Sequence, residues 1–213
     1  MSKRLVIIGS ENHARMLKSR ADDLGIECAG YLDDYKDKGQ DIRGAIVLGG
    51  IKDKDFAGRF SNKDVDMALG LSNAYMPLRR DVIEYFSAMG YSFKTLVHDT
   101  SYIDKEAGIG EGCFIAPGAI VNRGVVLGKN CVVYSGAIIE HDSILGDNVW
   151  ISTGVKITGS VRIRDNCFLG AGAVVINDIE IGRGAVVAAG AVVTKDVQAN
   201  TMVAGVPAVI KRK

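Results

Sequence analysis

The chain has 213 residues and a formal net charge of +1, and neither half carries a long run of Lys and Arg. This length suits one large domain or two small ones. The near-neutral charge excludes the basic surface that neutralises many phosphates, so we expect no nucleic-acid partner.

The apolar segments are too short for a leader peptide or a membrane span. The first, Leu5 to Ile8, is shorter than the roughly 7 to 15 residues of a signal-peptide core. Gly or a charged residue interrupts every other apolar run before about 18 residues. We therefore expect a soluble, cytoplasmic protein.

The cysteines form no CxxC pair and no metal-like spacing with histidine, which predicts buried thiols rather than disulfides or zinc. They are Cys28, Cys113, Cys131 and Cys167.

Strands and helices alternate in the first half of the chain. The expected strands are residues 5–8, 27–32, 45–48, 66–71 and 93–97. The expected helices are residues 14–24 and 77–89, followed by Gly25 and Gly90 as helix stops. This alternation predicts a small parallel sheet flanked by helices, a Rossmann-like α/β domain over residues 1–98.

Within the second half, residues 99–213, the stretch from about Tyr102 to Ala199 follows a fixed period of six residues. Sixteen successive positions are aliphatic: Ile103, Ile109, Ile115, Val121, Leu127, Val133, Ile139, Leu145, Ile151, Ile157, Ile163, Leu169, Val175, Ile181, Val187 and Val193. A period of six fits neither an α-helix nor a coiled coil, but it fits a short strand followed by a corner. Three such units make a triangular coil of eighteen residues with the aliphatic side chains inside. The pattern predicts a parallel β-helix with a C-terminal tail.

These repeats resemble those of the hexapeptide-repeat acyltransferases, whose coil is a left-handed parallel β-helix. A narrower resemblance rests on the N-terminal turn ending in His13, the pair Asp33-Asp34, the tract Glu140-His141-Asp142 and the closing residues 205–208. These features resemble the sugar O- and N-acetyltransferases that include sialic acid O-acetyltransferase and the UDP-4-amino-sugar N-acetyltransferase of bacillosamine synthesis. The resemblance implies a homotrimer with acetyl-CoA between neighbouring β-helices and with the substrate nucleotide in the N-terminal domain.

Within the repeats His141 is the single histidine, and it lies two places after the inward position Ile139, near a corner. The resemblance implies that His141 is the general base and that Asp142 raises its basicity; Glu140 is the less favoured carboxylate partner. An imidazole with an unperturbed pKa near 6.5 can accept a proton at neutral pH. The chain contains only three histidines, which disfavours a zinc carbonic anhydrase on the same scaffold, so no metal is expected.

The resemblance also implies two binding sets. The expected substrate-binding residues are Ser10, His13, Asp33, Asp34 and Gly70, and the expected acetyl-CoA contacts are Trp150, Ala171, Ala189 and Lys195. Lys195 and the tail residues Lys211, Arg212 and Lys213 could meet CoA phosphates or only promote solubility.

Several of these residues keep an alternative role. The two aspartates could bond ribose hydroxyls or simply begin a solvated turn. His13 and Ser10 could contact substrate or cap the first helix. Glu11-Asn12 replaces two glycines of the family, which places a negative charge at a helix start where phosphate would approach. Trp150 replaces a second histidine of some members, so its expected role is packing against the cofactor.

The leading hypothesis is therefore transfer of acetyl from acetyl-CoA to the amino group of a nucleotide-linked amino sugar, a step in surface-glycan precursor synthesis. A second hypothesis is O-acetylation of a sugar hydroxyl, as in the sialic acid enzymes. A third, from a different class, is a catalytically silent trimeric scaffold, which would bind no acetyl-CoA.

Overall fold

The computed structural model describes residues 3–211. The chain divides into two compact units, Met1–Leu96 and Val97–Lys213, and each is considered by itself. Among the described residues, no helix is both long and apolar enough to cross a membrane.

The N-terminal unit is built on a four-stranded parallel sheet with strand order β3-β2-β1-β4. The strands are β1 (Arg4–Ile8), β2 (Cys28–Leu32), β3 (Val47–Gly49) and β4 (Val65–Leu69). Strand β1 lies in the interior of the sheet, and its residues Leu5 to Ile8 are fully buried. A strand covered on both faces needs a continuous apolar run, which explains why this segment does not alternate with polar residues.

The helices of this unit are α1 (Asn12–Asp23), α2 (Phe56–Arg59), η1 (Asn73–Tyr75) and α3 (Met76–Ala88). Phe56, Phe86 and Tyr91 form an aromatic cluster with ring centroids 5.6–5.9 Å apart. Because β1, β2 and β4 run parallel, the loops after all three strands lie at one edge of the sheet. Those loops carry Ser10, Asp33 and Gly70.

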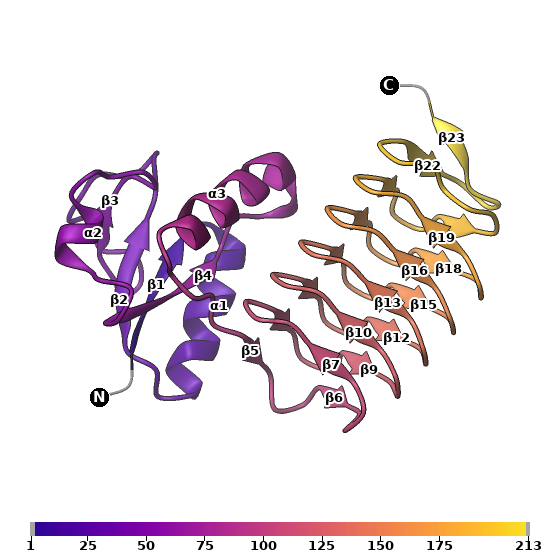
Figure 1. The fold of residues 1–213 in the computed structure, drawn as a ribbon, viewed down its shortest axis with the longest axis horizontal. Coiled ribbons are helices and arrows are strands. Elements are labelled where there is room, and N and C mark those ends of the chain that lie inside the picture. The colour runs from indigo at the N-terminus through magenta and orange to yellow at the C-terminus, as the bar shows by residue number, and fades with distance from the viewer. Residues whose placement is uncertain (1–2, 212–213) are drawn as a thin grey trace. The chain divides into compact units, whose positions relative to one another are not determined.

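The C-terminal unit is a left-handed parallel β-helix made of three sheets, whose strands Figure 1 shows stacked in rows as far as the yellow C-terminal end. The five-stranded sheet contains β7 (Gly108–Ile109), β10 (Val126–Leu127), β13 (Ile144–Leu145), β16 (Arg162–Ile163) and β19 (Glu180–Ile181). The six-stranded sheet contains β6 (Tyr102–Ile103), β9 (Ile120–Val121), β12 (Ile138–Ile139), β15 (Lys156–Ile157), β18 (Val174–Val175) and β21 (Val192–Val193). The eight-stranded sheet contains β5 (Leu96–Val97), β8 (Phe114–Ile115), β11 (Val132–Val133), β14 (Trp150–Ile151), β17 (Phe168–Leu169), β20 (Val186–Val187), β22 (Met202–Ala204) and β23 (Val209–Lys211).

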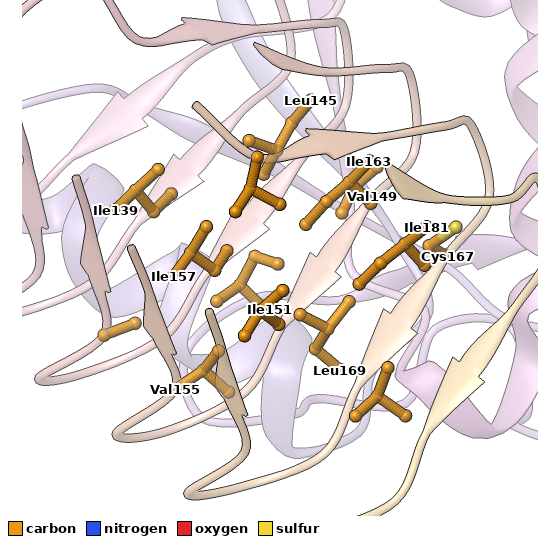
Figure 2. Packing of buried hydrophobic residues seen from close by; sticks show 14 of the residues in the cluster. Ile139, Leu145, Val149, Ile151, Val155, Ile157, Ile163, Cys167, Leu169 and Ile181 are labelled. Carbon is orange, nitrogen blue, oxygen red and sulfur yellow. The ribbon is translucent and has the colours of Figure 1, made fainter. Parts of the chain in front are cut away.

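From β6 to β18, each repeat strand pairs in parallel with the strand eighteen residues further on, as Ile139 does with Ile157. Figure 2 shows the aliphatic side chains of successive coils meeting inside the β-helix. Every six-spaced position from Ile115 to Val193 is buried, while Ile103 and Ile109 of the first coil are partly buried. Each such side chain contributes roughly 1.5–3 kcal/mol through burial. The predicted α/β domain followed by a left-handed β-helix is therefore confirmed.

Two local predictions differ from the structure. The strand expected over residues 93–97 is divided: Phe93 forms an isolated bridge with Met67, and only Leu96–Val97 form β5. Phe93 and Leu96 are both buried, so the apolar pattern continues across this point although the two segments join different sheets. The coils also extend past Ala199, since β22 pairs in parallel with β20 before β23 turns back antiparallel.

Candidate active site

His141 and Asp142 form a hydrogen-bonded pair at one corner of the β-helix. They follow β12 of the six-stranded sheet and precede β13 of the five-stranded sheet. His141 Nδ1 lies 3.0 Å from Asp142 Oδ2, and both side chains are exposed, at 57% and 69%. Asp142 has a φ of 60°, so this corner residue occupies the left-handed region and its carboxylate turns back toward the ring.

The contact determines which nitrogen of His141 can act as a base. A carboxylate only accepts hydrogen bonds, so in the neutral imidazole Nδ1 carries the proton and donates a hydrogen bond to Asp142. Nε2 is then the nitrogen with a free lone pair. An imidazole ordered in this way by a carboxylate can accept a proton from an attacking group and hold the resulting positive charge.

Glu140 faces a different partner. Its Oε2 accepts a hydrogen bond of 2.8 Å from Asn122 Nδ2, one coil earlier in the same sheet, and both residues are half-buried. The structure therefore pairs Glu140 with Asn122 and pairs His141 with Asp142. A catalytic role for Glu140 stays a prediction, and its carboxylate bonds to Asn122. Asn122 was missed in the sequence, although its separation of eighteen residues from Glu140 is the length of one coil.

The expected acetyl-CoA contacts fall on three parts of the β-helix. Ala171 and Ala189 are exposed and occupy one corner between the eight-stranded and six-stranded sheets, eighteen residues apart. Lys195 is exposed at the same corner as His141, three coils further on. Trp150 is only 4% exposed, and its ring centroid lies 5.3 Å from that of Tyr134. Little of the Trp150 side chain is thus left to pack against a cofactor in the single chain.

The basic tail is only partly described. Lys211 ends β23 and is exposed. Arg212 and Lys213 lie outside the described residues.

A cavity of about 220 Å³ lies at the carboxyl edge of the N-terminal sheet. The predicted substrate residues Asp33, Asp34 and Gly70 line it, together with Gly9, Glu11, Tyr35, Ile51, Leu71, Ser72, Tyr75 and Leu78. None of these lining residues is basic. Ser10 and His13 do not line the cavity. The sequence did not predict that aromatic residues line this cavity, because Tyr35 follows a strand end and Tyr75 lies in a short 3-10 turn.

The two aspartates hold the loops around this cavity. Asp33 Oδ2 accepts a hydrogen bond of 2.6 Å from Ser10 Oγ, and Asp33 Oδ1 accepts one of 2.8 Å from the Tyr35 amide. Asp34 Oδ1 accepts 2.8 Å from the Ile51 amide, across the neighbouring loop. Asp33 is buried, whereas Asp34 is exposed. Asp34 is therefore the carboxylate that a ligand in the cavity can reach more easily.

His13 is a buried residue of the first turn of α1, 3% exposed. Burial lowers the pKa of His13 well below its ordinary value of 6.5, and the nearby positive charge of Arg79 lowers it further. A hydrogen bond with the backbone of Leu69 opposes this shift. His13 is neutral at pH 7 and connects α1 to the end of β4, behind the cavity.

Among residues 3–211, no group of three or more His, Cys, Asp and Glu side chains could hold a metal ion.

Residues 106–141, 142–177 and 160–195 match the model of the bacterial transferase hexapeptide, six repeats. The structure is similar to the acetyltransferase domain of PglB from Neisseria gonorrhoeae FA1090, at 28% identity and a TM-score of 0.90, covering 99% of this chain and 100% of that chain. The same domain in complex with acetyl coenzyme A gives 28% identity, a TM-score of 0.89 and the same coverage.

A histidine-to-asparagine variant of perosamine N-acetyltransferase from Caulobacter crescentus, in complex with CoA and GDP-perosamine, is 25% identical with a TM-score of 0.91. That match covers 100% of this chain and 99% of the other. A comparison with curated proteins gives no match. The resemblance to hexapeptide acyltransferases is confirmed by the repeat match and by these structures.

Proposed function

We propose that the protein transfers acetyl from acetyl-CoA to the amino group of a nucleotide-linked amino sugar, in keeping with the match of its repeats to the bacterial transferase hexapeptide model. The observation that carries this proposal is the His141–Asp142 pair, with Nδ1 bonded to the carboxylate at 3.0 Å. Support comes from two similar structures over nearly the whole chain, one with acetyl coenzyme A and one with CoA and GDP-perosamine.

The proposed reaction needs one base and no redox step. The amine nitrogen attacks the thioester carbonyl carbon, and its proton passes to Nε2 of His141 as the C–N bond forms. The C–S bond then breaks, and the imidazolium returns the proton to the departing sulfur, which leaves as the CoA thiol. Asp142 holds the ring and stabilises the imidazolium in between.

We assign the acceptor's nucleotide to the N-terminal cavity. The exposed carboxylate of Asp34 can accept hydrogen bonds from ribose hydroxyls, and Tyr75 and Leu78 supply apolar surface for a base. Glu11 lies at the N-cap of α1 and lines the same cavity. A diphosphate approaching this helix start meets a negative charge, which weakens binding compared with a neutral residue.

We propose that the working enzyme is a homotrimer with sites shared between chains. In one chain, His141 and the pair Ala171 and Ala189 occupy opposite edges of the six-stranded sheet. A neighbouring β-helix packed alongside would bring an Ala171 corner next to a His141 corner. Acetyl-CoA could then contact the alanine backbone of one chain while its thioester reaches the base of the other.

The test is a panel of UDP-, GDP- and dTDP-linked 4-amino sugars, with free sialic acid as the hydroxyl acceptor. Each is incubated with acetyl-CoA, and release of CoA thiol is followed. We expect turnover with one amine and a kcat lower by about 10²- to 10⁴-fold in His141→Ala, with little change in acetyl-CoA affinity.

Turnover of sialic acid alone would overturn N-acetylation in favour of O-acetylation. Absence of acetyl-CoA binding by calorimetry would overturn the enzymatic proposal and favour a scaffold. A His141→Ala variant that keeps more than half of the parent kcat would reject His141 as the base, because a positioned base contributes far more than twofold.

A further inference from the structure

We propose that Gly159, one coil beyond His141, is a positioning residue that provides the surface on which the imidazole lies, and that Ser143 holds the turn carrying it. This inference rests on the proposed role of His141 as the base. It concerns two residues that lie outside the His141–Asp142 pair.

Gly159 occupies the position of His141 in the next coil. The residues are eighteen apart, and the backbones of the two corners are joined because the Ser160 amide donates to the His141 carbonyl at 2.9 Å. The next coil repeats the arrangement, with the Asp178 amide donating to the Gly159 carbonyl at 3.2 Å. Gly159 is buried although it is part of a corner turn, whereas His141 is exposed.

The imidazole of His141 fills the space that a side chain at Gly159 would need. A Cβ built on Gly159 would lie 2.5 Å from Cε1, 2.6 Å from Nε2 and 3.2 Å from Nδ1 of His141. Three ring atoms at such short distances mean that the ring rests on the glycine. The shortest distances involve the edge that carries Nε2, the proposed proton acceptor.

The turn itself does not require glycine at this position. Many corner glycines have a φ in the left-handed region, as Gly124 does at +70°, and need glycine for that reason. Gly159 has no such φ, so alanine could adopt its backbone conformation. The remaining reason for glycine at position 159 is the room that it leaves for the His141 ring.

Ser143 fixes the turn that contains Gly159. Its side chain is fully buried in the interior row where neighbouring coils have Val125 and Val161. Ser143 Oγ donates to the Thr158 carbonyl at 3.1 Å and accepts from the Val161 amide at 3.2 Å. One hydroxyl therefore joins both ends of the turn over residues 158–161 to the coil that carries the base. A polar residue in an otherwise apolar row is explained by this link.

The ring is thus held from two directions. Asp142 holds Nδ1 through a hydrogen bond, and Gly159 sets how closely the Nε2 edge of the ring approaches the backbone of the next coil. A methyl group at position 159 would displace the ring by about 1 Å, and a misplacement of that size costs on the order of 10²-fold in rate.

The test compares Gly159→Ala with Gly108→Ala. Gly108 also has no left-handed φ, and a Cβ there would meet no described atom within 4 Å, so it is a matched control for adding a methyl group to this β-helix. We expect Gly159→Ala to lower kcat by about 10²-fold with the KM for acetyl-CoA and the melting temperature close to the parent values. Gly108→Ala should match the parent in all three. Ser143→Ala should lower kcat in the same direction, and Ser143→Thr, which keeps the hydroxyl, should recover part of the loss.

A double substitution separates action through the base from general damage. If Gly159 acts through His141, then His141→Ala with Gly159→Ala should be no slower than His141→Ala alone. Additive losses would overturn the inference, as would a Gly159→Ala variant with more than half of the parent kcat. If His141→Ala itself leaves kcat unchanged, the assignment of His141 as the base fails instead. Failure of the proposed function can thus be distinguished from failure of this inference.

A second readout does not depend on turnover. Nitrogen NMR of histidine-labelled protein should show His141 protonated on Nδ1 in the parent and in Gly108→Ala. Gly159→Ala should shift the His141 signals and lower the fraction of the Nδ1–H tautomer. Unchanged His141 signals in a folded Gly159→Ala variant would overturn the proposal.

Discussion

Replacing Asp142 by Asn tests the proposed role of the carboxylate beside His141 with little effect on the backbone. Asp142 has a φ of 60°, a conformation that Asn adopts more readily than most residues. The side chain keeps its shape but loses the negative charge of the carboxylate, whose Oδ2 lies 3.0 Å from His141 Nδ1. We expect kcat to fall while the KM for acetyl-CoA stays close to the parent value, because the charge stabilises a species that exists only during proton transfer.

The size of the effect follows from the exposure of the pair. In the single chain both side chains are more than half exposed, so their attraction contributes only about 0.2–1 kcal/mol to stability. In the proposed mechanism His141 becomes positively charged in the transition state, and a hydrogen bond to a charged group contributes about 1.5–3 kcal/mol. Loss of that contribution lowers kcat by roughly 10- to 150-fold. This loss is smaller than the one expected for His141→Ala.

The assay is release of CoA thiol with the accepted amino sugar at saturation. Asp178→Asn is the matched control, because Asp178 has a φ of 61° and occupies the same corner two coils further on. The control should retain parent activity and melting temperature. The reasoning is refuted if Asp142→Asn keeps more than half of the parent kcat. An equal loss in Asp178→Asn would instead show that the corner, and not the pair, is sensitive.

Three further predictions address the acidic side of the stability profile, the nucleotide and the assembly. His13 has a folded pKa well below 6.5, so its stabilising contribution is complete above pH 6.5 and is lost as the pH falls and the unfolded chain takes up the proton. Between pH 8 and pH 5 the parent should lose up to about 2 kcal/mol more unfolding free energy than His13→Gln in urea titrations, and parallel curves would contradict the buried neutral histidine. Glu11→Gly should bind UDP, GDP or dTDP about two- to fivefold more tightly than the parent by calorimetry. Glu11→Gln, which removes the charge but keeps the size of the side chain, shows which of the two weakens binding. Absence of binding by every variant at millimolar nucleotide would reject the cavity as a nucleotide site. Light scattering should give a trimer. Co-expression of His141→Ala with Ala171→Trp should restore activity that each variant lacks alone. A stable monomer or absence of complementation would argue against shared sites.

The β-helix could be predicted because a single physical reason recurs at every sixth residue. An aliphatic side chain such as Ile139 or Ile157 must point inward, and the strand it belongs to can only pair with the strand one coil away. The same phase placed His141 near a corner. Two contacts of the site also join residues that are eighteen apart, Glu140 with Asn122 and His141 with Gly159. They can be found in the sequence once residues one coil apart are treated as neighbours.

The N-terminal site was less accessible to such reasoning because its contacts are not periodic. Asp33 was identified from its place after a strand, but its bond to Ser10 depends on how two loops meet at the sheet edge. The sequence left His13 with two possible roles, contact with substrate or capping of the first helix, and the structure buries it in α1 outside the cavity lining. The position of Tyr75 depends on a short 3-10 turn that has no distinctive sequence pattern.

The β-helix separates the residues that stabilise it from those that could carry out chemistry. The interior rows keep the coils together whatever occupies the corners, so Arg123, His141, Gly159 and Asn177 can differ completely at one corner position while the aliphatic positions around them stay buried. Ser143 is the exception, because this interior residue bonds to the turn next to His141. Chemistry at a corner therefore costs the fold little except where the interior must hold the corner still. For the same reason, substitutions at His141 and Asp142 should change the rate with little change in melting temperature, whereas Ser143→Ala should change both.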